Sequence, residues 1–500
     1  MKINLENKTK KCYRELIRQS RRIQETAECV VPDVNDDIGK IASIQTAIYL
    51  KSKDITGRGV IVTGEALAAV LYITEGEKAV SYIKITKPFT LEFDCAELDT
   101  DAAAQVKLAV VNTEARVLNP RKVSLTFEIA GELSCYKEDN VVVKTELAAG
   151  GHKGIHARSC ETELVCINAV NEKTFTLSEQ FIFPTGKPSP AQIVIPKVAF
   201  AVNDCQLIGT KLIVKGSVEI CACYLSEEVN YPLKTEFSTP FSQIIEIGTE
   251  NMDTCSAMIE LSSVYYDIVN TINGEKALDI EIHAVLQAVS RKSGTFAYIS
   301  DVYSNLMPTQ CEMQQYSINA AACCQQIKLI CDERVNVVDD CADVLSVYSD
   351  ISQLNIQSDK ISAAVMLDIV YRTQSGGLSS VRRLLSLSAD CGKTPDRLIN
   401  VYLADVYLRP DGAYIDSHIV IELSYLYAQK KEVSCVAALT LDEETPYDFS
   451  AFPTVTLVRP EKEDIWELAK TYHSSVEQIL AVNQFTEDGE RKMLLIPKSV

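Results

Sequence analysis

Residues that could act as catalytic groups or metal ligands do not have the spacing those roles need in this 500-residue chain. His152 and His156 have the i, i+4 spacing of two metal ligands on one face of a helix. Gly150, Gly151 and Gly154 surround them, and glycine disfavours the helix that this spacing needs. The sequence therefore predicts a solvent-exposed loop here and no metal site.

Sequence motifs of the common enzyme classes are also missing. The glycines at positions 57, 59 and 64 lead into a strand-like run and lack dinucleotide-binding spacing, and there is no phosphate loop or nucleophile elbow. Adjacent carboxylates are most simply solvated turn residues at three places, namely Asp36–Asp37, Asp339–Asp340 and Glu443–Glu444. We expect a protein that is not an enzyme and that uses no cofactor.

The 17 cysteines are odd in number and mostly lie within apolar runs such as 220–224. No two of them have the Cys-x-x-Cys spacing of zinc ribbons or thioredoxin-type sites. A disulfide framework is unusual in a long chain without an export signal. We expect free thiols that pack as small hydrophobic side chains.

The balance of charge excludes some classes of partner. Forty-nine basic residues against 68 acidic ones give a net charge of −19, which disfavours binding to nucleic acid or to anionic lipid. The first residues contain no apolar stretch suited to a signal peptide, and no run reaches the roughly 18 apolar residues of a membrane span. We expect a chain that stays in the compartment where it is made.

A repeat with a long period organises most of the chain. Residues 59–72 match residues 211–224, and further positions match at the same separation of 152 residues. The matched pairs are Ile41 with Ile193, Gly64 with Gly216, Tyr72 with Tyr224, and Phe89 with Phe241. Several independent matches at one separation indicate two copies of one domain.

A third, weaker copy carries the same tyrosine-ending run at 361–371. The copies then span residues 11–155, 156–310 and 311–446. Period-two alternation of apolar and polar residues, with Gly, Asn and Asp between the runs, predicts mainly β structure in three antiparallel sandwich-like or barrel-like domains. Near the N-terminus we expect a strand at about 22–31 and leave 8–21 open. Unpaired edge strands in such domains favour self-association.

The segment 454–499 has a different pattern, which predicts a small β-α-α-β domain. Strands are expected at 455–458 and 494–497, and Trp466, the single tryptophan, opens the first helix. The second helix should begin after Ser474 or Ser475, bury Val476, Ile479 and Leu480, and end at Asn483 in a left-handed conformation.

This C-terminal segment resembles a LysM module, through Trp466, the second helix, Asn483 and the closing Leu494–Pro497. The resemblance implies binding of N-acetylglucosamine polymers in a groove between two loops. One departure is that residues 460–464 replace the family's glycine-containing turn. Trp466 could therefore be a binding residue or only a core residue. The candidate residues for binding a partner or a glycan are Glu463, Asp464, Ile465, Trp466, Asn483, Gln484 and Phe485.

The whole chain resembles the SPOCS-domain sporulation proteins of clostridia, through residues 31–41 and 64–72 together with the C-terminal module. The resemblance implies work in the mother-cell cytoplasm at the forespore surface, where the module docks a spore coat morphogenetic protein, a SpoIVA-like ATPase. The leading hypothesis is a non-enzymatic scaffold or adaptor in spore coat assembly. The alternatives are a protein that binds peptidoglycan or N-acetylglucosamine through the module, and a self-polymerising layer protein.

Overall fold

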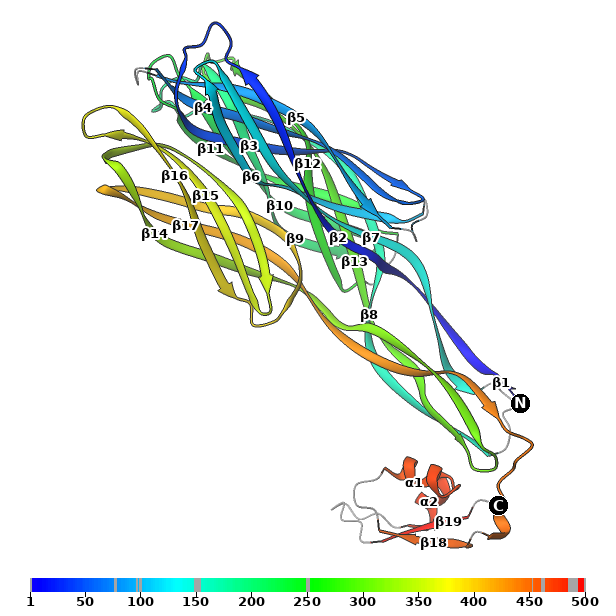
Figure 1. The fold of residues 1–500 in the computed structure, drawn as a ribbon. Helices are drawn as coiled ribbons and strands as arrows, with labels where there is room; N and C mark the ends of the chain where they lie inside the picture. The colour runs from blue at the N-terminus through cyan, green and yellow to red at the C-terminus, as the bar shows by residue number, and fades with distance from the viewer. Residues whose placement is uncertain are drawn as a thin grey trace.

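The structure is a computed structural model. It describes the whole chain except residues 1, 76–78, 96–97, 99–100, 148–153, 249–251, 452, 460–463, 484–492 and 499–500. The described chain is mainly β, as expected, with long antiparallel strands arranged in five separate sheets and two short α-helices near the C-terminus. In Figure 1 the strands form a broad upper body, from which a narrower stalk runs down to the chain termini.

The first two repeats share one plan, in which strands of two sheets contribute side chains to one hydrophobic cluster. In the first, β3–β4–β5 form one sheet and β2–β7–β6 lie in the other, and in the second the corresponding groups are β9–β10–β11 and β8–β13–β12. The bounds in the first repeat are β2 (Leu5–Val30), β3 (Ile38–Thr56), β4 (Gly59–Thr74), β5 (Val80–Asp94), β6 (Ala103–Asn119) and β7 (Lys122–Leu147). Those in the second are β8 (Ile155–Ile182), β9 (Gln192–Ile208), β10 (Lys211–Leu225), β11 (Leu233–Glu246), β12 (Thr254–Asn270) and β13 (Lys276–Ser304).

The third repeat has four strands in one continuous sheet, in the order β17-β14-β15-β16, because β14 pairs with β17 along one part and with β15 along another. Its strands are β14 (Thr309–Gln357), β15 (Lys360–Thr373), β16 (Leu378–Asp390) and β17 (Pro395–Leu441). Residues 309–336 of β14 pair with 414–441 of β17, as β8 pairs with β13, whereas residues 341–357 of β14 pair with β15.

The repeats are joined to one another by backbone pairing as well as by side chains. A six-stranded sheet, β12-β13-β8-β2-β7-β6, combines the first two repeats through a single pair, Tyr13 with Ile167. The N-terminal strand β1 (Lys2–Ile3) pairs with the end of β17 in the third repeat. The strand expected at 22–31 is therefore part of a longer strand that starts at Leu5 and follows the stalk.

Equivalent positions of the three repeats meet in the body. Leu71, Cys223 and Val370 each precede the tyrosine of the repeated run, and all three lie in one buried cluster. In the stalk, the ribbons β2–β7, β8–β13 and β14–β17 pack together through a second cluster that includes Leu5, Ile299 and Leu439. The repeats therefore associate much as three identical subunits would, within one chain.

The repeated glycine and tyrosine have a structural explanation. Gly64 lies opposite Phe89 across β4 and β5, and Gly216 lies opposite Phe241 across β10 and β11, so each aromatic ring covers a glycine. The buried tyrosines also match, since Tyr72 donates to the carbonyl of Asp36 (3.1 Å) and Tyr224 to that of Pro188 (3.2 Å). In the third repeat Ala363 lies opposite Leu387 at the corresponding position.

The C-terminal module follows a short 3-10 helix, η1 (Phe449–Ala451). Its elements are β18 (Val455–Val458), α1 (Ile465–Thr471), α2 (Val476–Val482) and β19 (Leu494–Pro497), and β18 pairs antiparallel with β19. Side chains cap both helices, since Asp464 accepts from the N–H of Trp466 and Ser475 accepts from that of Gln478.

Two details of the module differ from expectation. Asn483 is extended, with φ −114°, rather than left-handed, whereas His473, which follows α1, is left-handed at φ 52°. The Asn483 side chain instead brackets one residue of β19: it accepts from the N–H of Leu495 (2.9 Å) and donates to its carbonyl (2.6 Å). Leu480 is 45% exposed rather than buried, because Ile479 fills the core.

Candidate functional site

Trp466 lies between the C-terminal module and the lower end of the stalk. Its side chain is only 9% exposed. The indole Nε1 donates to Asp301 Oδ2 (2.9 Å), and the ring meets Tyr303 edge to face with the ring centres 4.9 Å apart. Both contact residues belong to β13, so the module rests on the end of the β8–β13 ribbon (Figure 1).

Further polar contacts surround this aromatic pair. Lys470 on α1 places its Nζ 2.7 Å from Asp301 Oδ2, and Arg158 on β8 forms an ion pair with Asp464 at 2.8 Å. The Tyr303 hydroxyl donates to the carbonyl of Ser474 (3.0 Å). Burial raises the pKa of Tyr303 above its ordinary value, so this hydroxyl keeps its proton and remains a donor at neutral pH.

The two histidines closest to this contact are packed side chains. His156 was expected in a solvent-exposed loop, but it lies in β8, half-buried, and stacks on Tyr303 with the ring centres 5.1 Å apart. That expectation was wrong because glycines 150, 151 and 154 precede the strand and do not interrupt it. Burial lowers the pKa of His156. His473 packs on Tyr447 at 3.9 Å, and His152 lies outside the described residues.

Those candidate residues predicted from the sequence that the structure describes lie in two different places. Asp464 and Trp466 face the β8–β13 ribbon, whereas Asn483 holds the edge of β19. Ile465 packs, partly buried, against the cluster that contains Trp466. Glu463, Gln484 and Phe485 lie outside the described residues. Sequence reasoning missed the residues of the ribbon that contact the module, Arg158, Asp301 and Tyr303, because nothing local distinguishes them from other strand residues.

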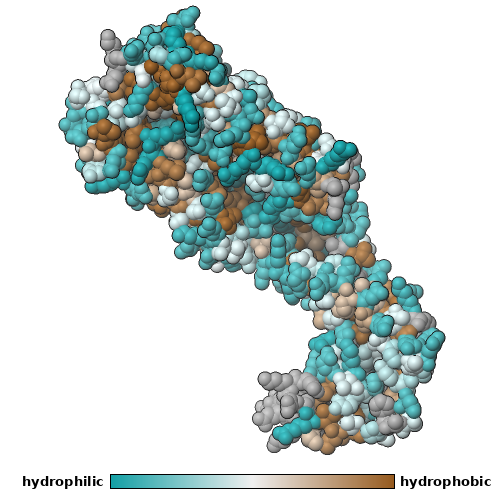
Figure 2. Space-filling model, in the orientation of Figure 1, coloured by the Kyte–Doolittle hydropathy of each residue, from teal (hydrophilic) through white to brown (hydrophobic). Residues whose placement is uncertain are grey.

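The outer face of the two-stranded sheet in the module is apolar, because Val455, Leu457 and Leu495 are exposed and alternate with residues that point the other way. Six large hydrophobic side chains of the module are between 42% and 55% exposed, and two of them, Leu457 and Leu495, are paired neighbours across β18 and β19. The six are Val455, Leu457, Leu480, Val482, Met493 and Leu495. Figure 2 shows hydrophobic side chains at the module, at the lower end of the molecule. Exposed apolar side chains concentrated on so small a domain are typical of a protein-binding surface.

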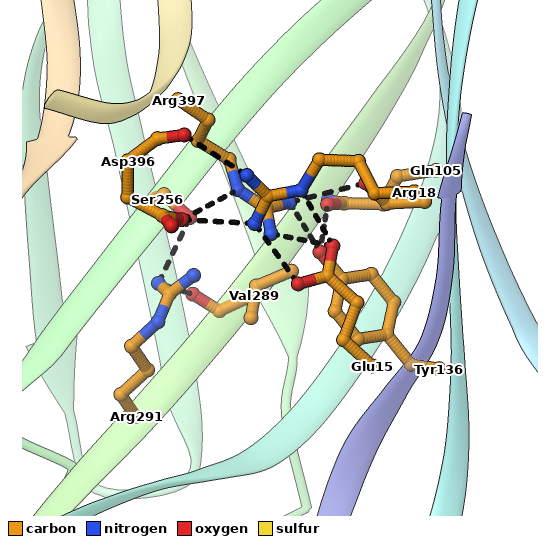
Figure 3. Close-up of polar contacts among 10 residues, drawn as sticks. Glu15, Arg18, Gln105, Tyr136, Ser256, Val289, Arg291, Asp396 and Arg397 are labelled. Atoms are coloured by element: carbon orange, nitrogen blue, oxygen red, sulfur yellow. Dashed lines mark hydrogen bonds and ion pairs between the residues drawn. The ribbon is translucent and has the colours of Figure 1, made fainter. Parts of the chain in front are cut away.

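A buried polar network lies where the three repeats meet (Figure 3). Arg397 of the third repeat donates to Glu15 (2.7 Å) and to the hydroxyl of Tyr136 (2.5 Å), both in the first repeat. Arg18 bridges Glu15 (2.9 Å) to Asp396 (2.8 Å). Burial would raise the pKa of Glu15, but the arginines Arg18 and Arg397 outweigh it and hold the pKa below its ordinary value.

The second repeat joins the same junction. Arg291 on β13 donates to the Ser256 hydroxyl (3.0 Å) and lies beside the other arginines in Figure 3. Gln287 clamps the backbone of Val106 in the first repeat: its amide nitrogen donates to the carbonyl (2.8 Å), and its oxygen accepts from the N–H (2.9 Å). Gln287 thus joins the second repeat to the first, whereas the hydrogen bonds of Arg291 stay within the second repeat.

A cavity of about 690 Å³ opens between the three ribbons of the stalk. Each repeat contributes one buried cysteine to its lining: Cys12 from β2, Cys166 from β8 and Cys435 from β17. Burial raises the pKa of Cys435 to about 11, which keeps that thiol protonated. All 17 cysteines are free, and within the described residues there is no cluster of three or more His, Cys, Asp or Glu side chains able to hold a metal ion.

Comparison with known families identifies part of the chain. The family model described as "SipL, SPOCS domain" matches residues 37–118 and 191–269. The first match covers β3 to β6 and the second covers β9 to β12, which are corresponding parts of the first two repeats. The first two repeats thus carry SPOCS-domain sequence, which is consistent with a sporulation-related protein. No curated protein matches the sequence. Within the part of the chain that is described, no helix is long and apolar enough to cross a membrane.

Proposed function

We propose that this SPOCS-domain chain is a non-enzymatic scaffold for spore coat assembly in the mother-cell cytoplasm, where it works at the forespore surface. The observation that carries the proposal is the family match on corresponding parts of two repeats. The interlocked architecture supports it, because three repeats joined by shared sheets and a buried polar network form a rigid platform.

The C-terminal module, which we take to be a LysM module, is proposed to dock a coat morphogenetic protein, a SpoIVA-like ATPase. Its exposed apolar face, which includes Leu457 and Leu495, supports a protein ligand. The position of Trp466 makes a glycan ligand less favoured, because its indole donor and ring are already used by Asp301 and Tyr303. A sugar that stacks on this ring would first have to displace both contacts.

Direct binding tests the proposal. The purified SpoIVA-like ATPase is titrated with the intact chain, with a chain lacking residues 447–500, and with Leu457→Asp. We expect saturable binding by the intact chain and none by the shortened chain. Leu457→Asp should bind at least tenfold more weakly, and a tenfold change in the dissociation constant corresponds to about 1.4 kcal/mol. Val34→Asp, which alters a 92% exposed valine far from the module, is the matched control. Equal binding by the intact and shortened chains would contradict the proposed role of the module.

A further inference from the structure

The end of the β8–β13 ribbon has the composition of a built interface. We call His156, Arg158, Asp301 and Tyr303 the ribbon tip. Tyr303 is 2% exposed and lies at the centre of the contact, between the ring of His156 and the ring of Trp466. A buried aromatic centre surrounded by polar pairs is the arrangement that concentrates binding energy in protein interfaces.

The polar groups of this interface are matched between the two sides. Both carboxylate oxygens of Asp301 accept from Lys470, at 2.9 and 2.7 Å, and Oδ2 also accepts from Trp466. The ion pair between Arg158 and Asp464 lies at the rim, where both side chains are about half exposed, and contributes orientation more than stability.

The linker between the stalk and the module also packs on both. The N–H of Tyr447 donates to the carbonyl of Leu306 (3.0 Å), next to the end of β13, and the Tyr447 ring packs on His473 of the module. The tether from the end of β17 at Leu441 to the start of β18 at Val455 is short. A short tether gives the module a high effective concentration at the ribbon tip, so modest contacts suffice to hold it there.

We infer that the ribbon tip is an internal receptor for the α1 face of the module, and that any external ligand of Trp466 has to compete with Asp301 and Tyr303. Trp466, one of the residues predicted to bind a ligand, is then available only when the module leaves the tip. The consequence for coat assembly rests on the proposed function: a partner that uses the α1 face binds the released module, whereas one that uses the apolar outer face binds the docked module.

The single tryptophan makes the docked state directly measurable. In the intact chain, Trp466 emission is expected at short wavelength, with weak quenching by acrylamide. Asp301→Ala removes the acceptor of both Trp466 and Lys470, so we expect red-shifted emission and at least threefold stronger quenching. Asp267→Ala is the matched control, because Asp267 makes the same local contact to the next N–H as Asp301 but lies on β12, away from the module.

A substitution in the module, Lys470→Ala, tests whether the effect of Asp301→Ala comes only from misfolding of the β8–β13 ribbon. Lys470→Ala should also red-shift the emission, while circular dichroism and the unfolding midpoint of the β repeats stay unchanged in both variants. Solvent-exposed emission from the unaltered chain, or identical quenching of the unaltered chain and both variants, would overturn the inference. Binding of the SpoIVA-like ATPase is measured in a separate titration. If both variants show red-shifted emission but the ATPase does not bind the chain, the internal receptor is supported and the proposed function is contradicted.

Discussion

The indole of Trp466 donates a 2.9 Å hydrogen bond to Asp301, a residue 165 positions earlier in the chain. This bond joins the C-terminal module to the second β repeat. It gives the single tryptophan a structural role, whatever else the residue binds.

Removing this bond should loosen the module while the β repeats remain folded. Trp466→Phe keeps an aromatic ring against Tyr303 but leaves the partly buried Asp301 with one donor fewer. We expect a loss of about 1.5–3 kcal/mol in the docking of the module, the range for a hydrogen bond to a charged group. Limited proteolysis of the linker at 442–454 checks this, and cleavage at the unaltered rate would contradict it.

The glycines that lie opposite aromatic residues should tolerate no side chain. A Cβ at Gly64 would meet the ring of Phe89 and, at 2.7 Å, the carbonyl oxygen of Tyr49. We expect Gly64→Ala to lower the free energy of unfolding by about 1–3 kcal/mol, as overpacked cores do. Gly57→Ala is the control, because nothing lies within 4 Å of its Cβ position. Equal unfolding midpoints for both variants in a denaturant titration would contradict the packing described.

The arginine at the junction of the repeats should be essential for their association. Arg397 is 8% exposed and reaches Glu15 and Tyr136 in another repeat. Arg397→Leu removes the hydrogen bonds to Glu15 and Tyr136 while Arg18 still pairs with Glu15, so we expect destabilisation of about 1.5–3 kcal/mol, the range for a hydrogen bond to a charged group. Arg116→Leu, at a side chain 80% exposed, is the control and should change little. A denaturation midpoint of Arg397→Leu equal to that of the control would refute this role.

A buried carboxylate between the first and third repeats should give a defined pH dependence. Burial raises the pKa of Asp368 to about 6 despite Arg382 beside it and the Ile44 N–H that it accepts. Because the folded-state pKa lies above the ordinary 3.8, the folded chain binds this proton more tightly, and its contribution to stability falls as pH rises from about 4 to about 6.

Asp368→Asn isolates the contribution that ionisation of Asp368 makes to stability. Asp368→Asn cannot ionise and retains an acceptor for Ile44. The stability of the variant relative to the unaltered chain should therefore rise between pH 4 and pH 6 and level off above, by about 3 kcal/mol in total for a pKa moved from 3.8 to about 6. Denaturant titrations at several pH values measure it, and a difference independent of pH would show that Asp368 ionises normally.

The mainly β fold could be predicted because its signals are local and repeated. The alternation of apolar residues marked the strands, and the glycine and tyrosine pairs at 64 and 72, and at 216 and 224, now have matching partners. The change of partner along β14, from β17 to β15, could not be predicted in this way, because it depends on residues distant in the sequence.

The contacts of the candidate site were beyond sequence reasoning for a different reason. Trp466 was identified by its rarity, but Asp301 and Tyr303 are ordinary strand residues until the module is placed against them. Asn483 was expected to be left-handed because asparagine often is, and here the edge of β19 offers its side chain two hydrogen bonds in an extended conformation. Both cases depend on partners distant in sequence.

The position of the chain in sporulating cells tests the central claim most directly. A fluorescent fusion of the intact chain should surround the forespore, whereas a fusion lacking residues 447–500 should stay diffuse in the mother cell and leave a misassembled coat. The scaffold account would be contradicted if the shortened chain surrounded the forespore as the intact one does and the spores formed a normal coat.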